Sequence, residues 1–141
     1  MKTPVNYFLA KTDPDCYSID DFAREKETVW DGIRNPAAVL AIKSWKIGDR
    51  VLIYHSQGQA CIVGLAQVTG APHPDPRNEK SWVGKLKLTR TYPESQRVTL
   101  REVKATGLFA DFALVKQSRL STMPCPPKFI DWLRARGLDI S

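Results

Sequence analysis

A tryptophan stands directly before an Asp-Gly pair at Trp30-Asp31-Gly32, in a short segment between two expected helices. A flat indole at a turn is poorly placed for a central core, and it can stack against a nucleobase or another planar group. A partly buried tryptophan that covers a helix end produces the same pattern. Both interpretations of Trp30 stay open, but we expect the segment 30–35 to line a binding pocket.

Polar side chains also follow two apolar strands. Tyr54-His55-Ser56 ends one strand and Lys11-Thr12 ends the first strand of the chain. If these strands pair, their ends converge with the segment 30–35 on one cleft. The competing interpretation is a set of strands that simply run out into water, with Asn35 serving only as a helix N-cap.

No arrangement typical of an enzyme accompanies these residues. The chain lacks a glycine-rich phosphate loop, a dinucleotide-binding glycine pattern and a nucleophile elbow. Cys61 and His55 have no third group to orient them, and helix capping explains the Asp20-Asp21 pair. We therefore expect no catalytic residues.

The thiols and imidazoles predict neither a disulfide nor a metal site. Cys16, Cys61 and Cys125 are odd in number and far apart, and His55 and His73 do not supply the spacing of a zinc site. We expect three reduced, mostly buried cysteines, no metal and no cofactor.

The hydrophobic patterns predict strands near 5–10, 50–55, 60–68 and 82–91. Helices are expected after Ser18, after Asn35-Pro36, after Thr99 with Glu102 completing a capping box, and after Pro126-Pro127. We expect a turn at 28–32, a loop at 70–79 and extended pieces at 114–115 and 119–123, and Gly64 predicts a bulge or a close backbone approach. The order lacks a regular β-α-β alternation, so it favours a small, nearly closed mixed sheet decorated by helices in one domain spanning 1–141.

The chain has 141 residues, 43% of them hydrophobic, and a net charge of +6. No apolar run reaches the length of a membrane span, so we expect no membrane partner, a cytoplasmic location, or a nuclear one in a eukaryote. The stretch 13–27 is acidic, whereas 77–104 holds eight basic residues: Arg77, Lys80, Lys85, Lys87, Arg90, Arg97, Arg101 and Lys104. This asymmetry suits docking on a phosphate backbone, and it is equally typical of a mixed solvated surface.

Eight short segments, taken in order, resemble the EVE domain family, a branch of the PUA-like superfamily that is similar to YTH domains. They are Tyr7–Pro14, Tyr17–Asp21, Trp30–Asn35, Lys46–Asp49, Tyr54–Ser56, Ile62–Gly64, His73–Pro76 and Arg119–Ser121. The resemblance implies an α+β fold, a PUA-like pseudobarrel with a mixed, mostly antiparallel sheet. It also implies a pocket for a flipped, modified base of DNA or RNA.

The same resemblance implies particular roles for residues. Trp30 is the wall that stacks the base. The remaining pocket residues are Lys11, Thr12, Arg34, Asn35, Tyr54, His55, Ser56, Arg119, Leu120 and Ser121. The basic stretch holds the phosphate backbone, with Arg77, Lys80, Lys85, Lys87 and Arg90 as its candidates.

Three hypotheses follow. The first is a non-catalytic, monomeric reader of modified bases in DNA or RNA. The second is a small hydrolase of acylated cytidine-type nucleosides, as in some related ASCH proteins, with Lys11 as nucleophile or base and Asp13 as its only nearby acidic partner. The third is an interaction module that recruits an effector protein such as a nuclease.

Overall fold

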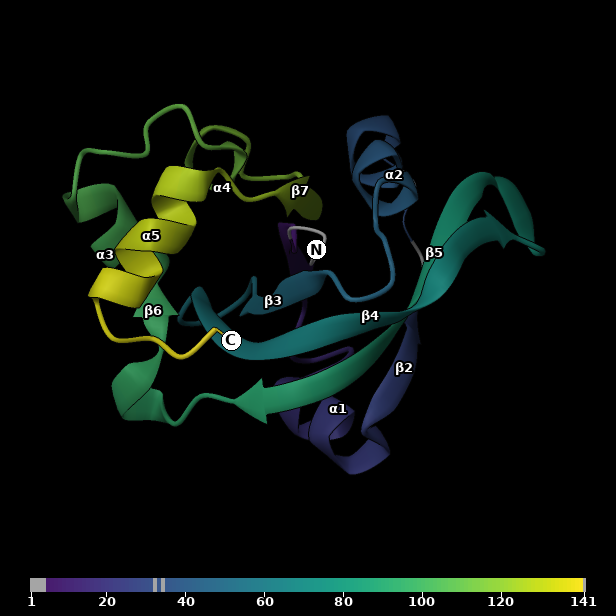
Figure 1. The fold of residues 1–141 in the computed structure, drawn as a ribbon, viewed down its shortest axis with the longest axis horizontal. Coiled ribbons are helices and arrows are strands. Elements are labelled where there is room, and N and C mark those ends of the chain that lie inside the picture. The colour runs from purple at the N-terminus through teal and green to yellow at the C-terminus, as the bar shows by residue number, and fades with distance from the viewer. Residues whose placement is uncertain (1–4, 32, 34, 141) are drawn as a thin grey trace.

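The chain forms one curved sheet with short helices packed around it (Figure 1). The computed structural model describes residues 5–31, 33 and 35–140, and the elements below are those of this part of the chain. The strands are β1 (Tyr7–Thr12), β2 (Glu27–Trp30), β3 (Arg50–His55), β4 (Cys61–Asp75), β5 (Asn78–Thr91), β6 (Val98–Thr99) and β7 (Thr122–Pro124). The helices are α1 (Ile19–Glu25), α2 (Pro36–Lys43), α3 (Leu100–Ala105), α4 (Ala113–Lys116) and α5 (Pro127–Ala135), with a 3-10 turn, η1, at Glu94–Gln96.

The strands are arranged in the order β2-β5-β4-β3-β1-β7, with β6 beside β4. β1 and β3 run parallel, and the other paired strands run antiparallel. The expected α+β class, with a mixed and mostly antiparallel sheet and short helices, is confirmed.

β2 and β7 are the outermost strands in this order. Residues of β2 and the residue just before β7 nevertheless line the same pocket. The sheet therefore bends until its two edges face each other, which is the geometry of a nearly closed barrel. Among the described residues no ladder joins β2 to β7, so the barrel stays open at this seam.

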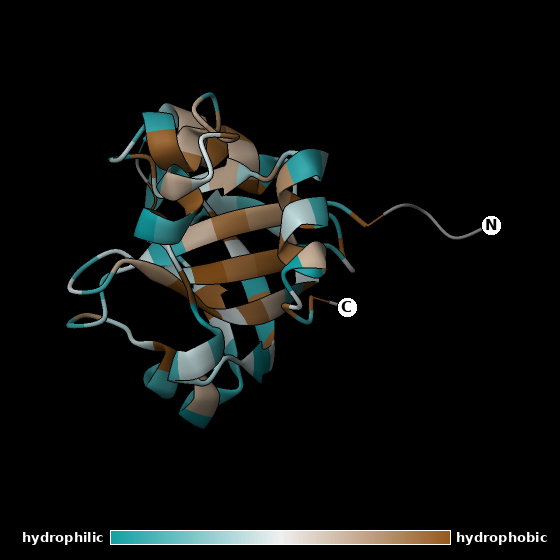
Figure 2. Ribbon diagram, turned by 90° about the vertical axis from the view of Figure 1, so that its left-hand side faces the viewer, coloured by the Kyte–Doolittle hydropathy of each residue, from teal (hydrophilic) through white to brown (hydrophobic). Residues whose placement is uncertain are grey.

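The core lies on the central strands. Leu9, Leu52 and Leu65, one from each of β1, β3 and β4, are fully buried. Figure 2 shows the apolar colouring concentrated on these strands, while the loops are largely hydrophilic. Away from the pocket, α5 is fixed by an aromatic cluster in which Phe129 packs against Phe109 and Phe112, with ring centroids 5.2 and 4.7 Å apart.

Two helices beside the pocket begin at the caps that the sequence predicts. Ser18 and Asp21 form a reciprocal capping box at α1, and the Asn35 side chain accepts from the backbone N–H groups of Ala37 and Ala38 at α2. At α3 the Thr99 hydroxyl accepts from Glu102 N–H as expected. The Glu102 carboxylate is bonded to Arg136, which explains why the expected capping box is only half formed.

Three local expectations are wrong. The expected turn at 28–32 is largely strand β2, because Thr28, Val29 and Trp30 pair with β5. The expected loop at 70–79 is the outer part of a long β4–β5 hairpin, whose register shifts near Gly70 and Pro74 accommodate residues that fit a regular ladder poorly. The expected extended piece at 114–115 belongs to α4.

Two glycines allow elements to approach the sheet closely. A Cβ on Gly64 would lie 2.6 Å from the Ile19 side chain of α1, and the β3–β4 register shifts beside it. The expectation for Gly64 is therefore confirmed. A Cβ on Gly84 would lie 2.6 Å from the Trp45 ring, so Gly84 lets the segment after α2 pack on β5.

Within the described residues, no helix is long and apolar enough to cross a membrane. The same residues hold no group of three His, Cys, Asp or Glu side chains placed to bind a metal. All three cysteines are free thiols, but Cys16 is exposed, unlike the buried thiols that we expected.

Candidate functional site

A pocket of about 590 Å³ opens where the ends of β1 and β2 approach the residue before β7. This volume lies within the usual range for small-molecule sites. β1 brings Lys11 and Thr12, and Ser121 is fixed beside them because its carbonyl accepts from the Lys11 backbone N–H at 2.7 Å. Among the described residues, the lining is Lys11, Thr12, Asp13, Cys16, Tyr17, Thr28, Val29, Trp30, Asp31, Ile33 and Ser121.

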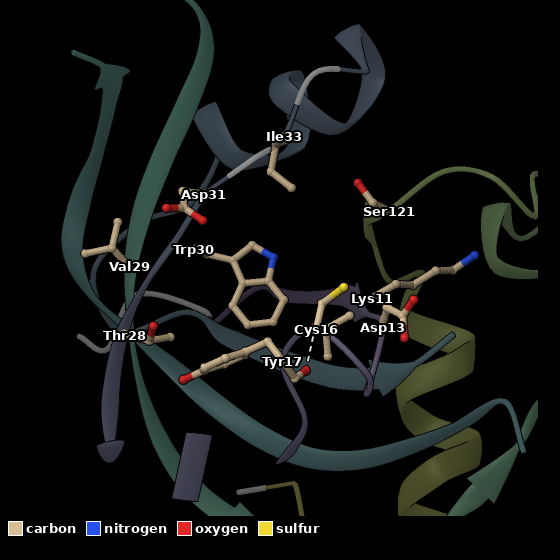
Figure 3. Close-up of a pocket in the computed structure, with 11 residues that line it drawn as sticks. Lys11, Asp13, Cys16, Tyr17, Thr28, Val29, Trp30, Asp31, Ile33 and Ser121 are labelled. Carbon is tan, nitrogen blue, oxygen red and sulfur yellow. Dashed lines mark hydrogen bonds between the residues drawn. The ribbon is translucent and has the colours of Figure 1, made fainter. Parts of the chain in front are cut away.

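The Trp30 indole forms one wall of this pocket, and its nitrogen points toward the space below Ile33 and Ser121 (Figure 3). Only 6% of Trp30 is exposed. Its ring meets Tyr17 edge-on, with centroids 6.3 Å apart, and packs at a tilt against Phe22 at 6.4 Å. Both interpretations of the sequence therefore apply, because Trp30 is a core residue on one side and a pocket wall on the other.

The turn after β1 forms the opposite side. The Thr12 hydroxyl donates to the Tyr17 carbonyl at 2.7 Å, which closes the turn that carries Asp13 and Cys16. Figure 3 shows the Cys16 sulfur between the Trp30 ring and the Lys11 side chain. An exposed thiol thus lies in the lining itself.

Lys11 crosses the rim of the pocket. Its ammonium donates to the Ser118 carbonyl at 3.0 Å and lies 5.7 Å from the centroid of the Tyr54 ring. Partial burial lowers the pKa of Lys11 from its usual value. No carboxylate of the described residues forms an ion pair with this amine.

Two carboxylates line the pocket with Lys11. Asp13 accepts from the Asp15 backbone N–H at 2.9 Å, so one of its oxygens belongs to the turn. Asp31 lies at the end of β2, where Arg77 of the β4–β5 hairpin donates to it at 3.1 Å. A pocket with two acids and one amine suits a neutral ligand with hydrogen-bond donors better than a phosphate group.

The strand end at 54–56 lies behind the pocket lining. Tyr54 is buried, and burial raises its pKa to about 12. His55 Nε2 accepts from the Ile19 backbone N–H at 3.0 Å, so this imidazole holds the start of α1. Ser56 is bonded to the Thr12 carbonyl. These three residues support the turn beside the pocket.

The other expected pocket residues are distributed differently. Asn35 caps α2 and is outside the lining, as is the exposed Arg119. Leu120 is a core residue with 7% exposure. Arg34 lies outside the described residues. Of the expected set, the structure brings Lys11, Thr12, Trp30 and Ser121 together in the lining.

Sequence reasoning did not single out several lining residues. Asp31 and Ile33 belong to the expected segment 30–35, and Thr28 and Val29 precede it, but they carried no individual signal. Asp13 lies in the segment Tyr7–Pro14 and is the expected acidic partner of Lys11, but the sequence does not assign it to the base pocket. Cys16 and Tyr17 follow Asp13 in the same turn, and the exposure of a thiol cannot be read from the sequence.

The expected phosphate-binding residues do not gather in one place. Arg77 contacts Asp31 of the pocket and is also paired with Asp75. Lys85 lies across the strands from Val29 of the pocket, and its ammonium is 4.0 Å from Glu27. Lys87 is exposed two residues farther along β5. Lys80 lies in a separate groove beside α2, and Arg90 is paired with Asp139 at 2.9 Å.

Known proteins resemble this chain in sequence and in fold. Thymocyte nuclear protein 1 of Rattus norvegicus is 35% identical over 82 residues, which cover 50% of this chain and 36% of that protein. The chain thus matches little more than a third of the length of this relative.

A protein of Rhodopseudomonas palustris, solved by NMR, is 33% identical with a TM-score of 0.84 and covers 94% of this chain and 93% of its own. Human THYN1, solved in complex with DNA that contains 5-methylcytosine, has a TM-score of 0.83 and 20% identity over 95% of this chain and 99% of its own. An ASCH protein of Zymomonas mobilis, with a TM-score of 0.58 and 10% identity over 92% of this chain and 97% of its own, shares the fold.

The model of the EVE domain matches residues 6–136, nearly the whole chain. The chain belongs to the EVE domain family.

Proposed function

We propose that this chain is a non-catalytic nucleic-acid-binding module whose pocket takes up a flipped, modified base of DNA or RNA. The observation that carries the proposal is the pocket itself. It combines one aromatic wall, Trp30, with an amine and two carboxylates in a volume of about 590 Å³. A flat heterocycle with donors and acceptors on its edges matches that combination, and a base is accessible around all its edges only outside the stack.

The charges around the pocket support the same proposal. The carboxylates of Asp13 and Asp31 repel phosphate from the interior. Near the pocket, Arg77 is paired with Asp31 and Asp75, and Lys85 lies 4.0 Å from Glu27. A nucleotide therefore enters with its base inward and its phosphate outside the pocket. Human THYN1, which shares the fold, was solved with DNA that contains a modified cytosine.

A blocked pocket tests the proposal. Ser121→Trp places a large side chain in the lining, whereas Ser95→Trp adds the same side chain at an exposed serine of η1 outside the lining. Fluorescence anisotropy should be measured with matched DNA and RNA oligonucleotides that carry one modified or one unmodified base. We expect the parent and Ser95→Trp to prefer a modified base, and Ser121→Trp to lose that preference. Equal preference in all three proteins would reject the pocket as the binding site.

One observation favours hydrolysis of an acylated cytidine as a second candidate function. The lowered pKa of Lys11 is the direction that a nucleophilic or basic lysine needs. However, Asp13 serves the turn, and the Lys11 ammonium is bonded to a carbonyl rather than to a carboxylate. Turnover of N4-acetylcytidine by the parent, abolished in Lys11→Met, would replace the binding proposal with the hydrolase. We expect no turnover.

Recruitment of an effector such as a nuclease, a monomeric state and a cytoplasmic location stay predictions. A pull-down from native extract with and without nuclease treatment separates direct protein partners from partners bridged by nucleic acid.

A further inference from the structure

A second groove lies on the outer side of α2, against the start of β5. Its volume is about 480 Å³. We call it the α2–hairpin groove, and its lining is Pro36, Val39, Leu40, Lys43, Glu79, Lys80 and Trp82. Figure 1 shows α2 beside the arm of the hairpin that β4 and β5 form.

The groove combines an aromatic ring with exposed positive charge. The Lys43 ammonium lies 5.0 Å from the centroid of the half-buried Trp82 ring. Lys80 is exposed on the hairpin side, and Glu79 is the one acid in the lining. Leu40 keeps 66% of its surface exposed, so the groove presents an apolar side chain beside the charges. Basic side chains interleaved with a flat ring are the usual composition of a surface for unpaired nucleotides.

One hydrogen bond connects the strand that lines the groove to the segment that lines the base pocket. The buried Ser81, between the groove residues Lys80 and Trp82, donates its hydroxyl to the carbonyl of Ile33 in the pocket lining. Arg77, at the tip of the same hairpin, reaches Asp31 of the pocket. The two cavities are therefore neighbours, joined through the Ser81–Ile33 contact.

We propose that the α2–hairpin groove binds the nucleotides that flank the base held in the pocket, with Trp82 stacking a base and Lys43 and Lys80 contacting phosphates. This inference rests on the proposed function. A nucleic acid is the occupant that the charge favours, because two lysines face one glutamate in the groove.

Oligonucleotide length and salt dependence test the groove separately from the pocket. One probe is the mononucleotide of 5-methylcytosine, which has no flanking nucleotides, and the other is a single strand of about twelve nucleotides with a central 5-methylcytosine, longer than the smallest sites of single-strand binders. The groove variant is Lys43→Gln with Lys80→Gln. Its matched control is Lys116→Gln with Lys128→Gln, which removes the same charge from exposed lysines of α4 and α5.

For the long probe, the groove variant should reduce the magnitude of the slope of log affinity against log salt by about 1.4 to 1.8, whereas the control should leave it unchanged. Trp82→Leu should weaken the long probe about tenfold, with melting used to confirm that this variant folds. Both groove variants should bind the mononucleotide as the parent does.

An unchanged affinity and salt slope in the groove variant would overturn this inference and leave the proposed function intact. An equal loss for both probes would also overturn it, because the groove would then act only through the pocket. Failure of the proposed function has a different signature, in which Ser121→Trp binds the mononucleotide as tightly as the parent.

Discussion

Replacing Trp30 by alanine should impair both stability and binding, and the structure predicts the size of each effect. Trp30 is 94% buried, taken from its 6% exposure. A buried tryptophan removes roughly 200 Å² from water, which at ~25 cal/mol per Å² is worth about 5 kcal/mol. Alanine retains part of that burial, so we expect Trp30→Ala to lower the free energy of unfolding by about 3–5 kcal/mol. That loss is a large share of the ~5–15 kcal/mol typical of a domain.

The loss of stability and the loss of binding must be measured separately. Urea unfolding gives the first, and binding of a modified oligonucleotide below the unfolding transition gives the second. We expect the folded variant to bind about tenfold to a hundredfold more weakly, because one stacking contact is lost. Phe22→Leu is the control, since Phe22 supports the Trp30 ring but does not line the pocket. It should lower stability while the folded protein keeps its affinity within about threefold.

Two results would refute this reasoning. A stability loss below about 1 kcal/mol would mean that Trp30 does not pack as the aromatic contacts describe. A folded Trp30→Ala that binds the modified oligonucleotide as tightly as the parent would mean that the indole does not stack the base.

Three further predictions concern groups around the pocket. His55 accepts from Ile19 N–H through Nε2, and burial lowers the pKa of its imidazole below the ordinary value of a histidine. The folded state therefore binds the proton less well than the unfolded state. The contribution of His55 to the free energy of unfolding should be fully present above the pKa of the unfolded state and should fall as the pH drops from about 7 to about 5.5. The urea midpoint of the parent should therefore decrease across that range, whereas the midpoint of His55→Gln should change less. Gly84→Ala should cost about 1–3 kcal/mol in urea unfolding, because its new Cβ would overlap the Trp45 ring. Neither the parent nor Lys11→Met should hydrolyse N4-acetylcytidine faster than a sample without protein, as measured by chromatography.

Each of these outcomes can fail visibly. A pH-independent midpoint would show that the imidazole does not hold α1, and a Gly84→Ala protein as stable as the parent would show that Trp45 and β5 can separate freely. Turnover by the parent that disappears without Lys11 would establish the hydrolase.

The sequence predicted the elements whose signals are local. The apolar runs of β1 and β3 and the caps at Ser18 and Asn35 depend on neighbouring residues, so they were placed correctly. Strand β2 was missed because four residues beside an Asp-Gly pair resemble a turn until β5 provides the partner strand. The long hairpin was missed because prolines near its tip usually break a strand, and only the irregular register reveals how they are accommodated.

The candidate site was predicted in outline. Segment 30–35 contributes three described lining residues, Trp30, Asp31 and Ile33. Tyr54 and His55 end a strand with polar groups, and strand alternation places them on opposite faces. That alternation does not predict that Tyr54 is buried in the core or that His55 accepts a hydrogen bond at the start of α1. The partners of these side chains come from distant parts of the chain, and local patterns carry no information about them.

The most direct test of a base in the pocket uses the exposed thiol of Cys16 in its lining. Cys61 is buried, and burial raises the pKa of both Cys61 and Cys125, so Cys16 should react first with iodoacetamide. The rate of Cys16 alkylation should be followed by mass spectrometry with saturating modified oligonucleotide and with an unmodified oligonucleotide at equal occupancy. A flipped, modified base beside Trp30 predicts that only the modified oligonucleotide protects Cys16. An alkylation rate that is unchanged when the modified oligonucleotide is bound would contradict the account.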